Sequence, residues 1–449
     1  MTCLSPQMDA LDDLQPRRVV GSVSAARGLS VYVRDLPVPV GALVRLDPPG
    51  RPAQDDPMLG EVVGFSSSES IVMLYDSGDG IGPGTPVIAE QSSQLVPVGP
   101  GMLGRVLDGL GRPIDHGDSL RDLEARPLHA RPLRPLDRER ITEPLPTGVR
   151  AIDGMLTLGK GQRIGVFSGP GVGKSTLLAS IARNTAADVN VIALVGERGR
   201  EVKDFIELAL GDEGLARSVL IVSTSDESPL LRVRAANLAC AAAESFRDAG
   251  ADVMLMMDSV TRLAQAQRQI GLAAGEQPAT KGYPPSVFAI MPRLLERAGA
   301  RADGGSITGL YTVLVEGDDL TEPISDAARG ILDGHVALSR KLAGRGHFPA
   351  IDILESISRV ADDVCDAPHQ HARITVRTLL AAYAEAEELI NIGAYATGSN
   401  PRCDAAIAMK EQLDGYLRQA KGDATAYPLA CRQLIELGLT AEQLMPGTG

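Results

Sequence analysis

Residues 164–176 read IGVFSGPGVGKST: a short apolar stretch, a glycine-rich loop, and then a lysine followed by two hydroxyl residues. The apolar stretch has the length of a buried strand, and helix-forming residues follow the lysine. Glycines at such a strand-to-helix turn let backbone N–H groups point inward, where they bind phosphate oxygens beside the positive end of the helix dipole. The stretch therefore predicts a phosphate-binding loop.

Within this loop, Lys174 would reach the β- and γ-phosphates of ATP, and the Ser175 hydroxyl would bind Mg²⁺. The usual motif begins with glycine, whereas Ser168 stands at that position and is small enough for the loop to form. A glycine-rich turn without a ligand is the alternative, but the flanking strand and helix favour the phosphate site. The predicted contacts to the nucleotide are Gly169, Pro170, Gly171, Val172, Gly173, Lys174, Ser175 and Thr176.

An acidic residue that could complete a metal site follows a second apolar strand. Residues 253–257 are VMLMM, and Asp258 comes directly after them. Ligands of open parallel sheets bind at the carboxyl ends of the strands, so Asp258 is placed to hold Mg²⁺, mainly through water. An aspartate at a strand end is by itself more often a turn residue. Its combination with the phosphate loop favours the metal role.

Hydrolysis also needs a group that orients the attacking water. Glu197 follows the apolar strand 189–195 and would lie beside the phosphate loop if the two strands are neighbours. Its carboxylate could polarise water for in-line attack, and Arg198 could contact the γ-phosphate. The segment GERGRE, residues 196–201, also fits a solvated charge cluster at a helix start, and both interpretations stay open on these residues alone.

The N-terminal part of the chain reads as short strands. Glycine, proline and aspartate separate the strand patterns of residues 18–97, which predicts a small β-barrel domain. The strand patterns lie at 19–23, 29–33, 42–46, 60–64, 70–74 and 86–89. Before them, residues 1–17 carry Leu4, Met8, Leu11 and Leu14 on one helical face, which fits either a short partner-docking helix or a frayed tail.

The remainder predicts two further domains. Residues 98–365 alternate apolar strands with helices, which indicates an α/β domain with a parallel sheet covered on both faces. Residues 366–449 are predicted to be helical, with one helix at 372–392 and others after Pro401 and Pro428.

The composition of the chain disfavours nucleic-acid-binding and membrane-spanning proteins as functional classes. The 449 residues carry a net charge of −13, and only 3% are aromatic with no tryptophan, so nucleic-acid binding is disfavoured. The sequence shows no signal peptide and no apolar run long enough to span a membrane, which predicts a cytoplasmic protein.

Four further segments of the sequence resemble those of a known protein family. They are residues 196–207, DSVTR at 258–262, PATKGYPPSVF at 278–288 and VEGDD at 315–319. Together with the loop, they resemble the ATPase of type III protein export, flagellar or virulence-associated, which is similar to the catalytic β-subunit of F-type ATP synthase. The likeness covers roughly residues 18–435 and implies a Mg-dependent ATPase with a RecA-like P-loop domain, an N-terminal β-barrel and a C-terminal helical domain. It also implies a homohexameric ring with ATP at the subunit interfaces.

The resemblance assigns individual roles. Glu197 matches the catalytic carboxylate and Arg198 the neighbouring γ-phosphate contact. Asp258 matches the acidic residue of the Mg²⁺ site, and Arg262 matches the arginine four residues beyond it. Phe348 stands where the family places an aromatic ring, often tyrosine, against adenine.

Arg359 would by itself read as a surface arginine. In AIDILESISR, residues 350–359, it matches the arginine that reaches into the neighbouring subunit's site, where it would neutralise charge on the transferring phosphoryl group. Because the chain carries both Glu197 and Arg359, one kind of subunit could build the ring.

The resemblance favours the flagellar branch, because EELINIGAY at 387–395 and GSNP at 398–401 look like its members; virulence secretion is the alternative. A rotary ATPase subunit is disfavoured by residues 278–288 and would need a non-catalytic partner chain. An RNA translocase would need an aromatic, basic N-terminal domain, and a nucleotide-binding scaffold would not need the four catalytic residues Lys174, Glu197, Asp258 and Arg359.

The implied partners follow from the family. A stator or regulator protein would bind residues 1–17, and an export gate and chaperone–substrate complexes would meet the C-terminal helical domain. The ring would associate peripherally with the inner face of the bacterial cytoplasmic membrane, and no nucleic acid is expected.

Overall fold

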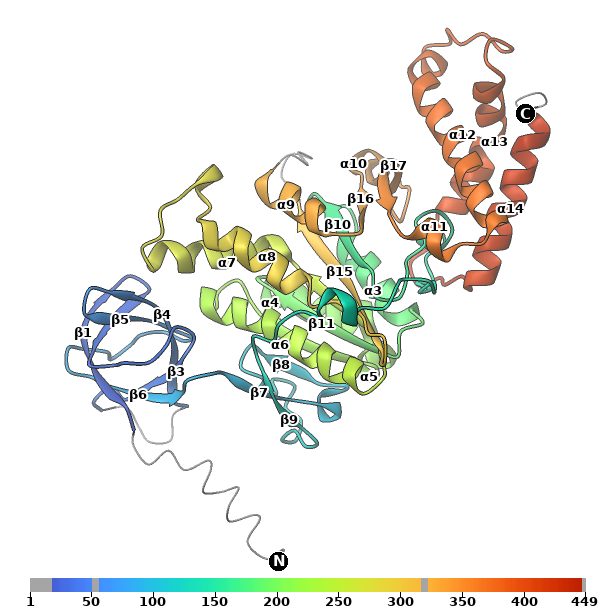
Figure 1. Ribbon diagram of the computed structural model, residues 1–449. Helices are drawn as coiled ribbons and strands as arrows, with labels where there is room; N and C mark the ends of the chain where they lie inside the picture. Colours follow the sequence, from blue (N-terminus) through green and yellow to red (C-terminus); the bar gives the residue numbers. More distant parts are fainter. Residues whose placement is uncertain (1–17, 51–55, 316–321, 446–449) are drawn as a thin grey trace, which may run out of the picture.

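The computed structural model describes residues 18–50, 56–315 and 322–445. A closed barrel and a helical domain lie at opposite ends of a central α/β domain (Figure 1). The amphipathic stripe predicted within residues 1–17 lies outside the described residues. None of the described helices is both long enough and apolar enough to cross a membrane.

The barrel confirms the prediction from the short strand patterns. Its strands follow the order β1-β2-β5-β4-β3-β6, and pairing of β1 with β6 closes it. Alternate residues such as Val33, Val44 and Val62 point inward and form its core. The strands are β1 (Val20–Arg27), β2 (Ser30–Arg34), β3 (Leu43–Leu46), β4 (Met58–Ser66), β5 (Glu69–Leu74) and β6 (Pro86–Gln91).

The central sheet has the strand order β17-β16-β10-β15-β13-β11-β12-β8 within the described residues, and β14 pairs with β15. Its strands are β8 (Val106–Asp108), β10 (Arg163–Ser168), β11 (Val189–Val195), β12 (Ser218–Ser223), β13 (Asp252–Asp258), β14 (Gly299–Ala300), β15 (Ser306–Leu314), β16 (Gly334–Leu338) and β17 (Ile351–Ser358). A separate pair consists of β7 (Leu95–Val98) and β9 (Glu124–Pro127).

The prediction of a wholly parallel sheet was wrong at two places. β14 pairs antiparallel with β15, and β17 pairs antiparallel with β16. The links 301–305 and 339–350 bring the chain straight back beside the previous strand, whereas a parallel neighbour requires a full crossover. The remaining pairs of this sheet are parallel.

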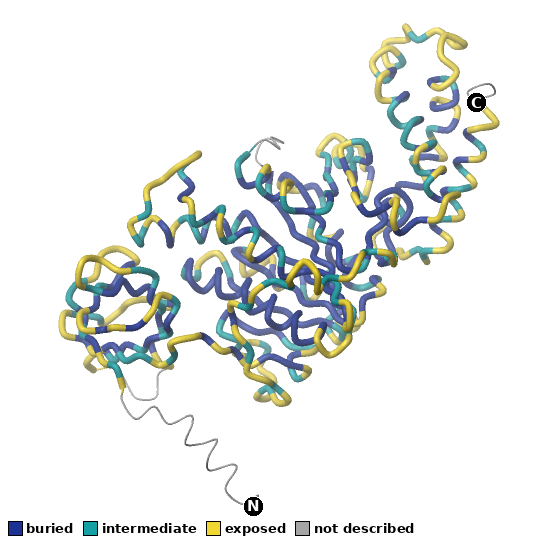
Figure 2. Tube along the Cα trace, in the orientation of Figure 1, coloured by how far each residue is buried: buried dark blue, intermediate teal, exposed yellow. Residues whose placement is uncertain are grey.

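Helices cover both faces of this sheet, as predicted. Val191 and Ala193 of β11 face a core that includes α6, α7 and α8, while Ile192 and Leu194 face a core that includes α3. The sheet is therefore the most deeply buried layer (Figure 2). The helices are α2 (Arg150–Met155), α3 (Lys174–Asn184), α4 (Gly199–Asp204), α5 (Gly211–Ala216), α6 (Pro229–Asp248), α7 (Val260–Ala273), α8 (Pro285–Leu295), α9 (Pro323–Ile331) and α10 (Arg340–Gly344).

The C-terminal helices confirm the third predicted fold element. α12 begins five residues earlier than residue 372, because the Asp366 side chain caps it by accepting a hydrogen bond from His369 N. Asn400 caps the next helix in the same way, and Pro401 occupies its first position. The helices are α11 (Ala361–Val364), α12 (Ala367–Asn391), α13 (Pro401–Leu417) and α14 (Tyr427–Leu444).

Candidate functional site

The glycine-rich loop lies at the carboxyl end of β10, and α3 begins at Lys174. Gly171 and Gly173 have φ values of 78° and 91°, which side chains with a Cβ rarely adopt. A Cβ at Gly169 would lie 2.7 Å from the Arg340 guanidinium, which is the end of a flexible side chain and could move aside. The backbone thus has the curl that the motif predicted, with Ser175 exposed at the start of the helix.

Lys174 meets two carboxylates at the carboxyl ends of other strands. Its Nζ donates a short hydrogen bond to Asp258 Oδ1 and lies 3.4 Å from Glu197 Oε1. Asp258 is only 4% exposed, and its Oδ1 also accepts a hydrogen bond of 2.6 Å from Thr312 Oγ1. The structure therefore brings together the three charged residues that the sequence singled out.

Glu197 lies beside the loop, although the strand that precedes it is not a neighbour of the strand that precedes the loop. β10 and β11 are not neighbours, because β15 and β13 lie between them. Lys174 nevertheless reaches the ends of both β13 and β11, so Glu197 joins the loop without strand adjacency.

The electrostatics of the cluster are set by burial and by mutual charge. Burial raises the pKa of Glu197 to about 7, and the nearby Asp258 charge adds to the effect while Lys174 opposes it. Burial alone would lower the pKa of Lys174, but Asp258 and Glu197 more than offset it and the pKa is raised. Lys174 is therefore charged, and Glu197 titrates near neutral pH.

A cavity of about 560 Å³, here called the loop cavity, opens beside these residues. Its lining includes Gly169, Pro170, Gly171, Gly173, Lys174, Ser175, Thr176, Gly196, Glu197, Arg198, Glu201, Ser225, Arg262 and Leu314. Arg262 Nε is buried and has no hydrogen-bond partner within the described part of the chain, and its Nη1 donates to Gln265 Oε1 at 3.1 Å. Arg198 is 80% exposed and pairs with Glu201 at 3.0 Å, away from Lys174.

A second cavity of about 620 Å³, here called the aromatic cavity, shares Gly173 and Thr176 with the first. Phe348 lines it, is 46% exposed, and lies 3.6 Å from the position of a Cβ on Gly173. Val172 and Leu177 add apolar surface. The opposite wall is formed by residues 418–423, between α13 and α14, which the sequence did not single out.

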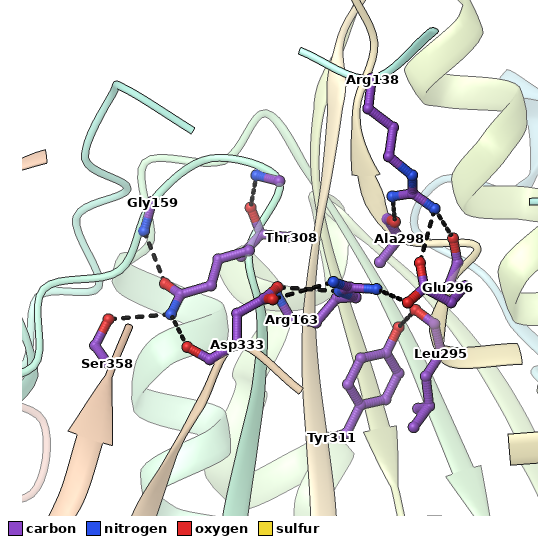
Figure 3. A network of polar contacts seen from close by, with 12 residues as sticks. Arg138, Gly159, Arg163, Leu295, Glu296, Ala298, Thr308, Tyr311, Asp333 and Ser358 are labelled. Carbon is purple, nitrogen blue, oxygen red and sulfur yellow. Dashed lines mark hydrogen bonds and ion pairs between the residues drawn. The ribbon is translucent and has the colours of Figure 1, made fainter. Parts of the chain in front are cut away.

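Arg359 does not join this cluster. It follows β17, which runs antiparallel to β16, so it lies at the opposite end of the sheet from Lys174 and is exposed. Its backbone N–H donates to the carbonyl of Asp333 at 2.9 Å, and Arg163 holds the Asp333 carboxylate with Nε and Nη2 at 3.0 Å each. Figure 3 shows the bonds between Arg163 and Asp333. The buried Gln162 side chain also donates to the Asp333 carbonyl and to Ser358 Oγ.

The donors near the loop fit a magnesium ion. The Ser175 hydroxyl is exposed, and the Asp258 carboxylate lies beside the loop lysine. No cluster of three or more His, Cys, Asp or Glu side chains suited to a metal occurs among the described residues. One hydroxyl and one carboxylate are enough for Mg²⁺, because this ion keeps several waters and takes further oxygens from substrate phosphates.

Thr312 and Glu201 are site residues that the sequence analysis missed. Thr312 follows Tyr311 in the second half of β15, and only its pairing with Asp258 reveals a role. Glu201 forms a hydrogen bond with Glu197 that lowers the pKa of Glu201. Glu201 lies within a charged segment, so the sequence contains no separate indication that it belongs to the site.

Comparison with known proteins gives consistent results. Residues 148–358 match the ATP synthase alpha/beta family nucleotide-binding domain, and residues 365–436 match the T3SS EscN ATPase C-terminal domain. The chain is 52% identical to the flagellum-specific ATP synthase of Treponema pallidum, covering 91% of each chain. It is 48% identical to the type 3 secretion system ATPase of Sinorhizobium fredii, covering 81% of this chain and 82% of the relative.

A solved structure is similar over almost the whole chain. It is the assembled ATPase EscN in complex with its central stalk EscO, from the type III secretion system of enteropathogenic E. coli. The TM-score is 0.85 at 42% sequence identity, covering 93% of this chain and 100% of EscN.

Proposed function

We propose that this chain, which belongs to the ATPase family of type III protein export, is the homohexameric motor of a flagellar export apparatus. The chain is an ATP-hydrolysing enzyme with a RecA-like P-loop domain, an N-terminal β-barrel and a C-terminal helical domain. The observation that carries the ring proposal is the separation of the site within one chain: Lys174, Glu197 and Asp258 lie together, and Arg359 lies at the other end of the sheet.

In this proposal the triphosphate of ATP enters the loop cavity and the base enters the aromatic cavity. Lys174 exchanges its two carboxylate partners for β- and γ-phosphate oxygens. Glu197 is then released to accept a proton from water, whose oxygen bonds to the γ-phosphorus as the bond to the ADP oxygen breaks. Arg262, which lines the loop cavity, is the further cation available to the phosphates, and Arg198 would have to leave Glu201 to join it.

Ser175, and Asp258 through water, would hold Mg²⁺ with the nucleotide. When bound, the ion supplies positive charge that neutralises the phosphate oxygens. Thr312 would keep the Asp258 carboxylate in place through its hydrogen bond.

Arg359 would act on the ATP of the neighbouring subunit. Fingers of this kind contribute about 10³–10⁵ in rate in related chemistry. The backbone bond to Asp333 and the Gln162 contacts support this role, because they fix the strand end from which Arg359 projects. Hydrolysis would then depend on assembly.

The flagellar assignment rests on residues 387–395 and 398–401. In the proposed apparatus, a regulator binds residues 1–17, a central stalk and the export gate meet the ring, and chaperone–substrate complexes dock on residues 366–449. The ring lies at the inner face of the membrane, with residues 18–97 and 98–365 as its barrel and motor domains.

Two inactive variants test the ring. Glu197→Gln lacks the carboxylate, and Arg359→Ala lacks the donated arginine. Each alone should be inactive, whereas an equal mixture should recover about a quarter of wild-type turnover, because random rings contain interfaces with both intact residues. Wild-type turnover per subunit should also rise with protein concentration. A mixture as inactive as its components would overturn the shared site.

The flagellar assignment is tested in Salmonella typhimurium strains that lack either the flagellum-specific ATP synthase or the ATPase of virulence secretion. Expression of this chain should restore motility in the first strain and not secretion in the second. The opposite pattern would assign the chain to virulence secretion and leave the ring proposal intact.

A further inference from the structure

One residue of the helical domain forms hydrogen bonds to several segments around the aromatic cavity. Gln419 donates its backbone N–H to the carbonyl of Phe348 at 2.9 Å. Its side-chain Nε2 donates to the carbonyl of Gly148 at 2.8 Å and to that of Asp423 at 2.9 Å. Its Oε1 accepts from the backbone N–H of Arg150 at 2.9 Å. The backbone of Gln419 therefore bonds the Phe348 main chain, and its side chain ties the 418–423 wall to the segment before α2.

The bond to Arg150 has a specific structural reason. Arg150 is the first residue of α2, whose N-cap is Val149, an apolar residue that offers no side-chain acceptor. The first N–H groups of a helix lack intrahelical partners, so Gln419 supplies from another domain an acceptor for the first of them. Arg150 in turn donates through Nη2 to the carbonyl of Arg418, which closes the junction from the other side.

We propose that Gln419 is a positioning residue for the nucleotide base. Its side chain fixes the 418–423 wall against the segment before α2, and its backbone holds that wall beside Phe348, so nucleotide affinity depends on the position of the helical domain. The inference rests on the proposed function, because it takes the base to occupy the aromatic cavity. Gln419 would not act on the phosphates, which belong to the loop cavity.

The hydrogen bonds of Gln419 support a role in building the aromatic cavity rather than in contacting the nucleotide. Both Nε2 hydrogens and the Oε1 acceptor are used on backbone partners, so the side chain builds the wall rather than reading the base. Recognition of the base then depends on stacking and shape. Because coupling between two sites is reciprocal, a partner that shifts the helical domain would change nucleotide affinity through this junction, and nucleotide would change the affinity for that partner.

The test compares a ligand that has a base with one that lacks it. Equilibrium dissociation constants for Mg-ADP and for Mg-pyrophosphate are measured for wild type, Gln419→Ala and Gln419→Glu. Gln419→Ala should weaken ADP about tenfold, the value of one or two lost hydrogen bonds, and leave pyrophosphate within about twofold. In turnover assays KM for ATP should rise and kcat should stay within about twofold, which separates positioning from catalysis.

Gln419→Glu keeps the acceptor for Arg150 but removes both donors, so it should weaken ADP at least as much as alanine does. The matched control is Gln412→Ala, since Gln412 is exposed on α13 and forms no hydrogen bond or ion pair among the described residues. Equal weakening of ADP and pyrophosphate, or no change in either, would overturn the positioning role. Failure of wild type to bind ADP while it binds pyrophosphate would instead reject the proposed function, and thermal melting checks that each variant is folded.

Discussion

The loop cavity and the aromatic cavity are neighbours, yet they are built in opposite ways. The loop cavity is lined by charged groups, and in one domain its two carboxylates stand at the ends of strands and its lysine at the start of α3. The aromatic cavity is mainly apolar, and the helical domain supplies a whole wall of it. A local backbone turn and strong charges are enough to hold phosphate, whereas a flat base needs surfaces from distant parts of the chain.

The largest effect of a single change is expected in the loop cavity. Glu197→Gln removes the proton acceptor for water and should lower kcat by about 10²–10⁴, while the dissociation constant for ADP stays within about threefold. Steady-state hydrolysis and ADP titration check this. Glu213→Gln on exposed α5 is the matched control and should be fully active. A loss of ADP binding equal to the loss of turnover would mean that Glu197 holds the site together rather than catalyses.

The next largest effect is expected in the pH dependence of hydrolysis, which should depend on the loop cavity and not on the aromatic cavity. Burial raises the pKa of Glu197 to about 7, so its carboxylate gains a proton as the pH falls through that value and loses its capacity as a base. kcat/KM, which reports groups of the free enzyme, should fall about tenfold for each pH unit below 7. Binding of the base should change little, because stacking on Phe348 carries no titrating group. A kcat/KM that stays flat down to pH 5.5 would contradict a base with this pKa.

The smallest effect belongs to the aromatic cavity. Phe348→Ala removes one stacking face and should raise KM for ATP about tenfold with little change in kcat, since the phosphates keep their contacts. Phe348→Tyr preserves the ring and should alter KM by less than about twofold. Pyrophosphate binding should be unchanged in both variants. If Phe348→Ala reduced kcat as strongly as Glu197→Gln, the two cavities would not be separable.

The sequence was sufficient to predict the loop cavity because its residues sit in short patterns with a local physical meaning. A strand, a glycine turn and a lysine define the loop, and an acidic residue after an apolar strand must emerge at the edge where ligands bind. Asp258 and Glu197 were found in this way, and family resemblance added Arg262. Thr312 was missed, because a threonine in a strand has no such meaning until its neighbour is known.

The aromatic cavity could be predicted only at Phe348, and there only by resemblance. Gln419 accepts a hydrogen bond from the N–H of Arg150, which lies 269 residues earlier in the chain. No periodicity in residues 418–423 indicates that contact. Strand order escaped prediction for the same reason. Neighbouring strands are chosen by packing across the sheet, so the separation of β10 from β11 and the reversal of β17 appear only in three dimensions.

The reversal of β17 also gives the proposed ring a polarity. In that ring, each subunit would have one face that donates an arginine and another face that receives one, so contacts between subunits would be heterologous. In an open row, the terminal receiving face has no donor, and only closure completes it. A subunit without Arg359 would therefore silence the nucleotide of its neighbour while its own site continued to turn over.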